Sequence, residues 1–243
     1  TSKIDVISEN KIPEFIINFC DGPFIEARNV SDKNKVIFYD LDSKEEVYSA
    51  IIGNGHWAKV NRKWATKYKI NVIDLTTNKL IFDHTYDCTG KRVFIGFDSS
   101  SLGDTIAWIP YVEKFRQKNK CEVIVSTFYN SLFKSKYPYL TFIEPGCAIE
   151  NLYAAYKLGI FNPNDRAYHK NDTRTIPLQQ AASDMLGLEY EEIKPEIFYE
   201  NKPRIKPEKI VCIGPQSTSG AKFWQRKEGW QTIINYLNEN GYR

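Results

Sequence analysis

Short runs in which apolar and polar residues alternate dominate the first 90 residues of the chain. Runs of this kind, separated by turn-forming residues, are typical of β-strands that bury one face. The pattern predicts strands at residues 15–20, 35–39, 46–52, 69–74 and 79–83. We therefore expect a small antiparallel β module, a sandwich or a barrel, over residues 1–90.

The pattern changes near Thr89-Gly90. Almost continuous apolar runs follow, which are typical of strands buried on both faces, and helical segments lie between them. The expected strands are residues 92–97, 121–126 and 141–144, and the expected helices are 103–119, 130–134 and 177–187. Pro110 lies inside the first helix and either kinks or restarts it. The alternation predicts a parallel, Rossmann-like domain over residues 91–202.

The last 41 residues, 203–243, repeat the beginning of such a domain. Residues 201–207 read as a linker, residues 209–214 as a buried strand, and residues 229–240 as a helix that Gly241 ends. One strand and one helix cannot bury their own faces. We therefore expect the second Rossmann-like domain to be incomplete in this chain.

Composition excludes several functional classes. A net charge of +3 gives no concentrated basic face, so we expect no nucleic-acid partner. No apolar run is long enough for a membrane span. The five cysteines are scattered without a CxxC pair and the three histidines are isolated, so the sequence offers no metal site. Dispersed thiols of this kind fit a reduced, cytoplasmic protein.

The loop Ser99-Ser100-Ser101-Leu102-Gly103-Asp104 joins the first apolar strand to its helix. In open α/β sheets ligands bind beyond the carboxyl ends of the strands, where this loop is expected. Gly103 allows close approach of a ligand to the backbone, and Asp104 could accept a proton from a hydroxyl. The alternative is that Ser101 or Asp104 caps the helix, and the pattern alone favours capping.

A second polar loop follows the expected strand at residues 209–214. It contains Gln216, Ser217, Thr218 and Lys222, whose hydroxyl, backbone N–H and ammonium donors suit a pyrophosphate. It is not a P-loop, because Lys222 precedes Phe223 rather than a Ser or Thr. A flexible polar loop with a surface lysine explains the segment equally well.

Two further patterns are weaker. Trp57 and Arg62 belong to an aromatic and basic cluster in the β module that could hold an acceptor, although ring packing and solvated charges explain it about as well. Asp40-Leu41-Asp42 has the DxD form of metal-dependent sugar transferases, but its place between two strands favours a turn.

Taken in order, the two loops resemble signatures of the bacterial lipopolysaccharide heptosyltransferases. The first is Ser100-Ser101-Leu102-Gly103-Asp104 with the helix through Pro110, and the second is the lysine-bearing loop Thr218–Trp224 with Trp230. The chain is more similar to the autotransporter heptosyltransferases, which carry a β-rich module ahead of the transferase domains. The resemblance covers nearly the whole chain.

The resemblance implies a GT-B fold and an inverting transfer of heptose from ADP-heptose to a hydroxyl of a protein acceptor such as an autotransporter. Asp104 would then be the general base, and Lys222 would stabilise the departing pyrophosphate. Gly103, Gln216, Ser217 and Thr218 would lie on the phosphate side, and Ser101, Trp57 and Arg62 on the acceptor side. On this interpretation helix capping falls to the serines, and a lysine with a helix N-terminus replaces a metal ion.

The chain also departs from that family, because none of its five cysteines has the spacing of the family's metal finger. Two other interpretations stay open. The chain could be a non-catalytic module that binds a glycan or a protein through its β region, or a transferase that uses another nucleotide sugar. A homo-oligomer is left open as well.

Overall fold

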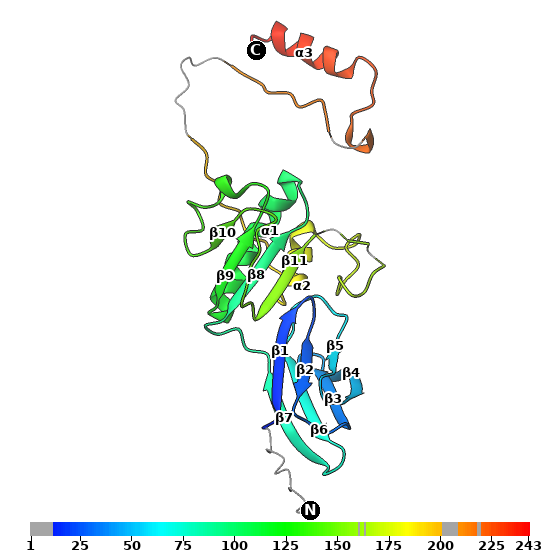
Figure 1. Cartoon of the computed structure of the whole chain (residues 1–243). Helices are drawn as coiled ribbons and strands as arrows, with labels where there is room; N and C mark the ends of the chain where they lie inside the picture. Colours follow the sequence, from blue (N-terminus) through cyan, green and yellow to red (C-terminus); the bar gives the residue numbers. More distant parts are fainter. Residues whose placement is uncertain (1–11, 160, 163, 201–208, 218–219) are drawn as a thin grey trace, which may run out of the picture. The chain divides into compact units, whose positions relative to one another are not determined.

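The computed structural model of the chain describes residues 12–159, 161–162, 164–200, 209–217 and 220–243. By the contacts between its residues the chain divides into two compact units, Thr1–Phe198 and Tyr199–Arg243. Figure 1 shows the helices and strands, and each unit is described by itself.

The first unit contains eleven strands and two α-helices in the described residues. The strands are β1 (Glu14–Cys20), β2 (Phe24–Arg28), β3 (Asn34–Asp40), β4 (Glu45–Ile52), β5 (Trp57–Lys59), β6 (Tyr68–Asp74), β7 (Lys79–Thr85), β8 (Arg92–Phe97), β9 (Glu122–Ser126), β10 (Thr141–Ile143) and β11 (Ala154–Leu158). The helices are α1 (Leu102–Asn119) and α2 (Leu178–Met185), with a 3-10 turn η1 at Asn130–Leu132.

A mixed sheet of seven strands has the order β10-β9-β8-β11-β1-β2-β5. Strands β10, β9, β8, β11 and β1 run parallel, whereas at one end β2 pairs antiparallel with β1, and β5 pairs antiparallel with β2. Strand β1 joins this sheet because Phe19 and Cys20 pair with Ala154 and Ala155 of β11. The first strand of the chain therefore extends a sheet whose other parallel strands lie beyond residue 91.

A second, separate sheet is antiparallel throughout and has the order β4-β3-β6-β7. Its central strands bury alternate side chains, among them Val36 and Phe38 on β3 and Ile70 and Val72 on β6. This sheet confirms the antiparallel strands that the alternating pattern predicts.

Helices α1 and α2 pack against each other, α1 also against β9 and α2 against β11. They cover the sheet face that carries Ile95 and Tyr156, as the edge-to-face contact of Phe115 with Tyr156 shows. Trp108 of α1 is buried against Phe97 of β8. The helix is continuous through Pro110, which settles the alternative between a kinked and a restarted helix in favour of one helix.

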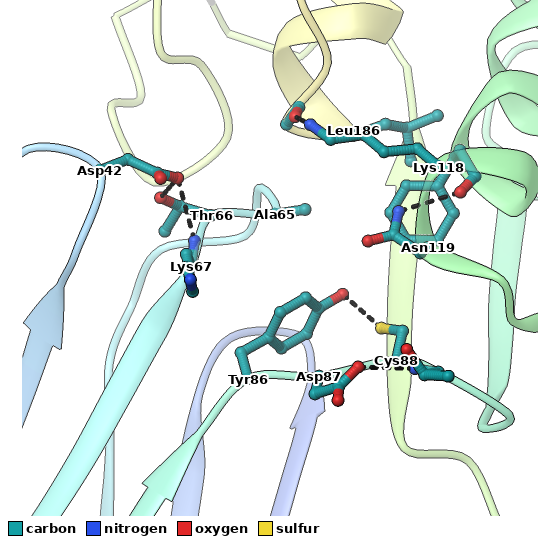
Figure 2. Close-up of a pocket in the computed structure, with 13 residues that line it drawn as sticks. Asp42, Ala65, Thr66, Lys67, Tyr86, Asp87, Cys88, Lys118, Asn119 and Leu186 are labelled. Atoms are coloured by element: carbon teal, nitrogen blue, oxygen red, sulfur yellow. Dashed lines mark hydrogen bonds between the residues drawn. The ribbon is translucent and has the colours of Figure 1, made fainter.

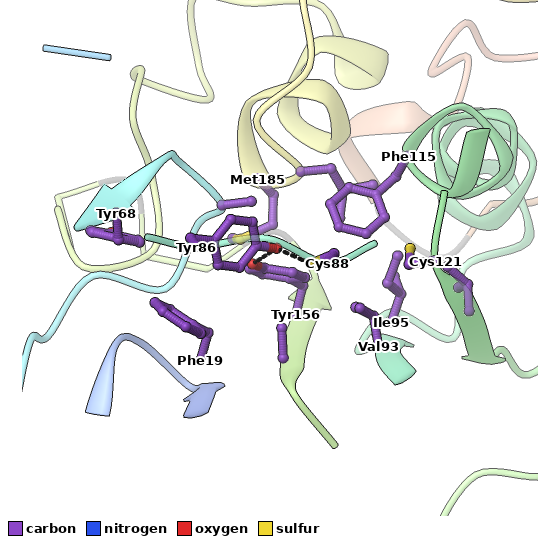
Figure 3. Packing of buried hydrophobic residues seen from close by; sticks show 14 of the residues in the cluster. Phe19, Tyr68, Tyr86, Cys88, Val93, Ile95, Phe115, Cys121, Tyr156 and Met185 are labelled. Atoms are coloured by element: carbon purple, nitrogen blue, oxygen red, sulfur yellow. Dashed lines mark hydrogen bonds between the residues drawn. The ribbon is translucent and has the colours of Figure 1, made fainter. Parts of the chain in front are cut away.

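Aromatic side chains form the core where the four-stranded sheet meets the parallel strands (Figure 3). The hydroxyls of Tyr86 and Tyr156 lie 2.7 Å apart, and the Cys88 thiol donates to Tyr86. Burial raises the pKa of both tyrosines well above the ordinary value, so these hydroxyls stay protonated. Buried polar groups of this kind require mutual hydrogen bonds, which fixes the packing of the two segments.

The second unit contains a 3-10 turn η2 (Gly220–Lys222) and helix α3 (Gly229–Glu239). Trp224 packs edge-to-face on Trp230 at 5.2 Å, and a side chain at Gly229 would lie 2.7 Å from the Trp224 ring. Gly241 has a positive φ of 77°, as expected for the glycine that ends a helix.

The strand predicted at residues 209–214 is wrong, because the described backbone there forms no strand and Ile210 and Val211 are exposed. An apolar run becomes a strand only when another strand pairs with it, and here only Lys209 and Val211 exchange backbone hydrogen bonds with Arg243. The linker expected at 201–207 lies outside the described residues.

The fold class is confirmed as mixed α/β, with a parallel sheet and a separate antiparallel sheet. Strands β2, β5 and β11 are additions that the sequence pattern did not predict. In the described part of the chain no helix is long and apolar enough to cross a membrane.

Candidate functional site

The carboxyl ends of β8, β9 and β11 meet at one edge of the seven-stranded sheet. The three strands are parallel neighbours, with Gly96 paired with both Ser126 and Lys157. Ligands of open α/β sheets bind at this edge, and the loop that carries Asp104 follows β8 directly.

Asp104 lies in the first turn of α1 and is half-buried. Its Oδ2 atom accepts a hydrogen bond of 2.5 Å from the hydroxyl of Ser99. The same hydroxyl oxygen accepts a hydrogen bond of 3.1 Å from the backbone N–H of Ser101. Asp104 therefore has one oxygen held by the loop, and its carboxylate is fixed at the carboxyl edge of the sheet.

The prediction that the serines cap α1 is wrong. Ser101 is the N-cap residue by position, yet its hydroxyl makes no capping hydrogen bond, and its carbonyl instead accepts from Thr105. The capping geometry needs a side-chain oxygen on the N–H of the second or third helical residue. The hydroxyl of Ser99, in the same loop, instead accepts a hydrogen bond from the Ser101 N–H and donates one to Asp104.

Hydrogen bonds tie the neighbouring loops of this edge together. The Tyr129 hydroxyl, after β9, donates to the Ser100 carbonyl at 2.8 Å. Buried Asn130 accepts from the backbone and hydroxyl of Thr127 and donates to the carbonyl of Ile143 at 2.8 Å. The loops after β8, β9 and β10 are thus fastened to one another, which keeps the Asp104 loop in place.

A cleft of about 510 Å³ opens at the same edge, on the sheet face opposite α1 and α2. Its floor consists of Phe94, Gly96, Ala155 and Lys157, and its rim includes Asp98, Ser126, Phe128 and Tyr168. At Gly96 a side chain would lie 2.9 Å from the Phe94 ring, so glycine keeps the floor open. The volume lies within the range of roughly 300–1,000 Å³ of sites that bind small molecules. Asp98 connects the cleft to the Asp104 loop, because it directly precedes Ser99.

Charged residues of the cleft lining take part in three ion pairs. Asp98 pairs with Lys157 at 2.7 Å, and Asp21 pairs with Lys63 and Lys59. Partial burial opposes charge on Asp21, but the two lysines outweigh it and hold the pKa of that carboxyl below its ordinary value. Because the lining contains aromatic rings as well as charges, the cleft suits a ligand that has both polar and apolar parts.

A different cavity, of about 300 Å³, lies at the carboxyl-terminal end of α1 (Figure 2). Cys88 lines it, and burial raises the pKa of this thiol to about 12, which keeps it protonated and unreactive. The Asp42 carboxylate on its wall accepts from Thr66 and from the Lys67 backbone. The Asp42 carboxylate and the Cys88 thiol of this cavity are therefore occupied by hydrogen bonds of the fold, and Asp104 lies at the other end of the same helix.

The acceptor-side candidates of the β region lie on separate elements. Trp57 of β5 is exposed and stacks on Phe24, whereas Arg62 pairs with Asp40 at 2.8 Å and lies over the Trp64 ring. Asp40 also accepts from Thr66 and from backbone N–H groups of the turn after β3. The segment Asp40-Leu41-Asp42 is therefore a turn, as predicted.

The phosphate-side candidates of the second unit are described only in part. Gln216 and Ser217 are exposed and lie outside helices and strands, and Thr218 lies outside the described residues. Lys222 ends η2, exposed, two residues before the Trp224 ring that packs on the start of α3. The described geometry thus joins the lysine loop to a helix N-terminus within this unit.

Sequence reasoning missed Ser99 and Lys157 as site residues. Ser99 stands in a run of three serines, and only the folded loop distinguishes it from its neighbours. Lys157 belongs to a strand that the pattern did not predict, although a lysine inside the apolar run Ala154–Leu158 was a signal for a strand with one polar face.

No group of three or more His, Cys, Asp or Glu residues is placed to hold a metal ion in the part of the chain that the structure describes.

Sequence comparison finds relatives over most of the chain, although no family model matches it. It is 33% identical over 190 residues, 77% of the chain, to the autotransporter heptosyltransferase Aah of Escherichia coli. It is 30% identical over 237 residues, 95% of the chain, to the autotransporter heptosyltransferase TibC of Escherichia coli O78:H11 (strain H10407 / ETEC). A third relative, 28% identical over 84% of the chain, is the inactive autotransporter heptosyltransferase BimC of Burkholderia thailandensis.

Comparison with solved structures finds TibC as well. The chain superimposes over its whole length on the crystal structure of TibC, described as a bacterial iron-containing dodecameric glycosyltransferase, with a TM-score of 0.87 and 26% identity. A second TibC structure, a complex with ADP-D-β-D-heptose, matches with the same TM-score and 25% identity.

The chain spans about half the length of the curated relatives that it matches. It covers 48% of Aah, 57% of TibC, 48% of BimC and 63% of the TibC chain in the crystal structures.

Proposed function

We propose that this chain, a homologue of the autotransporter heptosyltransferases over most of its length, is part of a glycosyltransferase of the GT-B type. The enzyme would act in the cytoplasm and transfer heptose, with inversion, from ADP-heptose to a hydroxyl of an autotransporter-type protein. The observation that carries the proposal is the match to the TibC complex with ADP-heptose, combined with a carboxylate fixed at the carboxyl edge of the parallel sheet.

In this reaction Asp104 acts as the general base. Its carboxylate takes the proton from the acceptor hydroxyl while that oxygen attacks the anomeric carbon of the heptose. The bond between the anomeric carbon and the phosphate oxygen breaks, and ADP leaves with the bonding electron pair. The proposal is supported by the position of Asp104 and by the second oxygen of its carboxylate, Oδ1, which accepts no hydrogen bond from the described residues.

Lys222 would stabilise the negative charge that develops on the departing pyrophosphate. The proposal rests on the order of the two loops and on the position of this lysine in the loop before α3. Gln216, Ser217, Thr218 and backbone N–H groups are the further donors proposed for the phosphates, and Gly103 is proposed as the small residue that lets a ligand approach the backbone of its own loop.

Replacing Lys222 by alanine is expected to lower kcat by roughly 10²–10³-fold, because one positioned donor to a developing anion is removed. ADP release from ADP-heptose in the presence of acceptor measures this rate in the full-length protein. Lys227→Ala, a nearby exposed lysine of the same unit, is the control and should behave as wild type. Equal rates for Lys222→Ala and the control would remove the lysine from the mechanism.

The cleft beside Asp98 is the proposed site of the acceptor polypeptide. Its aromatic rim, its ion pairs and its connection to the Asp104 loop suit a peptide segment that presents a hydroxyl. Ser101 belongs to the same loop, whereas Trp57 and Arg62 would contact the acceptor only farther along its length.

Lys157→Ala is expected to raise the acceptor KM by about tenfold, equivalent to about 1.4 kcal/mol of binding, with little change in kcat. The change frees Asp98 and removes a cation from the cleft floor, without touching the reacting atoms. Steady-state kinetics with varied acceptor checks the split. Lys134→Ala, exposed and outside the cleft, is the matched control. A loss in kcat with an unchanged KM would contradict an acceptor site here.

A non-catalytic role is the second candidate, since the relative BimC is described as inactive. Acceptor binding without any release of ADP by the full-length protein would favour it. The third candidate is a transferase that uses another nucleotide sugar. In a thermal-shift panel of nucleotide sugars, stabilisation by a donor other than ADP-heptose would identify such a transferase.

A further inference from the structure

The Ser99 hydroxyl stands between the strand end and the Asp104 carboxylate. It is a half-buried residue directly after Asp98, and its hydroxyl has one proton to donate and lone pairs to accept. The Ser101 backbone N–H donates to the Ser99 oxygen at 3.1 Å, which directs the single Ser99 proton elsewhere. That proton is donated to Asp104 Oδ2, and the two oxygens lie 2.5 Å apart.

We propose that Ser99 is a positioning residue for the reaction: it holds Oδ2 of Asp104 so that Oδ1 faces the acceptor hydroxyl. This inference rests on the proposed function, in which Asp104 is the base. A carboxylate on the first turn of a helix can rotate about its side-chain bonds, and a hydrogen bond to one oxygen selects one orientation. Hydrogen bonds to a charged acceptor are the strong ones, so a single serine hydroxyl suffices for this task.

The loop that carries Ser99 is itself held from two directions. The Tyr129 hydroxyl fixes the Ser100 carbonyl at 2.8 Å, and the Thr105 hydroxyl and backbone N–H both donate to the Ser101 carbonyl, at 3.0 and 3.2 Å. The Asp98 backbone N–H donates to the Leu158 carbonyl at 2.8 Å, which fixes the start of the loop to β11. Because both ends of the loop are held by hydrogen bonds, the Ser99 hydroxyl has a fixed position and therefore fixes the orientation of the Asp104 carboxylate.

The hydrogen bonds of Ser99 differ from those that a helix-capping serine would make. No side chain caps α1, and the Ser99 hydroxyl bonds the N–H of Ser101, the residue before the helix, instead of a helical N–H. A serine that only stabilised the helix would place its oxygen on the second or third helical N–H. The observed arrangement directs the hydroxyl to the carboxylate.

The test is a double-mutant cycle in the full-length protein with ADP-heptose and an acceptor protein. Ser99→Ala is expected to lower kcat roughly ten- to a hundredfold, the loss of a hydrogen bond to a charged group, and to leave both KM values unchanged. Ser99→Thr keeps the hydroxyl and should restore most of the rate. The melting temperature of Ser99→Thr should equal that of wild type, and Ser99→Ala should melt only a few degrees lower, because the loop keeps its other hydrogen bonds.

In the background of Asp104→Ala the same Ser99→Ala change should have no further effect, because Ser99 acts only through that carboxylate. An equal loss in both backgrounds, or a Ser99→Thr variant as slow as Ser99→Ala, would overturn the inference. The two proposals fail in different ways. Wild-type turnover by Asp104→Ala contradicts the proposed base, whereas an impaired Asp104→Ala beside a fully active Ser99→Ala contradicts the role of Ser99 alone.

Discussion

Asp104→Asn is expected to lower heptose transfer by roughly 10²–10⁴-fold, the contribution of a general base. The amide has nearly the shape of the carboxylate and still accepts the hydrogen bond from Ser99, so the loop and helix α1 should keep their structure. It cannot take a proton from the acceptor hydroxyl. The loss should therefore lie in kcat, with donor and acceptor KM almost unchanged.

Single-turnover transfer in the full-length protein is the measurement, because it reports the chemical step without product release. Asp32→Asn, an exposed carboxylate in the loop before β3, is the matched control and should react as wild type does. A rate for Asp104→Asn within a few-fold of that control would remove the base from the mechanism.

Trp108→Ala has the largest expected effect on the fold. The ring is 1% exposed, its edge faces Phe97 at a centroid distance of 6.0 Å, and its N–H donates to the Leu178 carbonyl at 2.9 Å. Truncation leaves a cavity between α1 and β8 and an acceptor at the start of α2 without its donor. A loss of about 3–5 kcal/mol in the free energy of unfolding is expected for a buried tryptophan.

Denaturant unfolding of the first unit, followed by circular dichroism, measures this loss. Gln117→Ala, exposed on the same helix, is the control and should change stability by less than about 0.5 kcal/mol. A change of that small size for Trp108→Ala would contradict the packing of α1 on the parallel sheet.

Local sequence patterns correctly predicted the strands and helices whose structure depends mainly on which of their own residues are buried. The apolar run at residues 92–97 is β8, and the segment predicted as a helix at 103–119 is α1 within one residue. The order of the seven strands depends on pairings between distant residues, such as Phe19 with Ala154, for which one sequence has no signal. The strand expected at 209–214 failed for the same reason, since its structure requires a partner strand that the pattern cannot supply.

The candidate site was likewise predictable from the sequence only where it depends on local residues. Asp104 was predicted at a strand end, and the structure puts its loop at the carboxyl edge of the parallel sheet. The cleft was not predicted, because Lys157 and Asp98 are 59 positions apart and meet only when β11 pairs with β8. The capping prediction failed because three neighbouring serines look alike in sequence. Only the folded backbone shows that the hydroxyl of Ser99 bonds the Asp104 carboxylate and that Ser101 makes no cap.

We propose that this chain belongs to an enzyme that puts heptose on a protein hydroxyl with Asp104 as the base. Mass spectrometry of an autotransporter passenger co-expressed with the full-length protein tests it most directly. We expect a passenger heavier by whole heptose units with wild type and an unmodified passenger with Asp104→Asn at equal expression. An unmodified passenger with wild type, or equal modification by both, would contradict it.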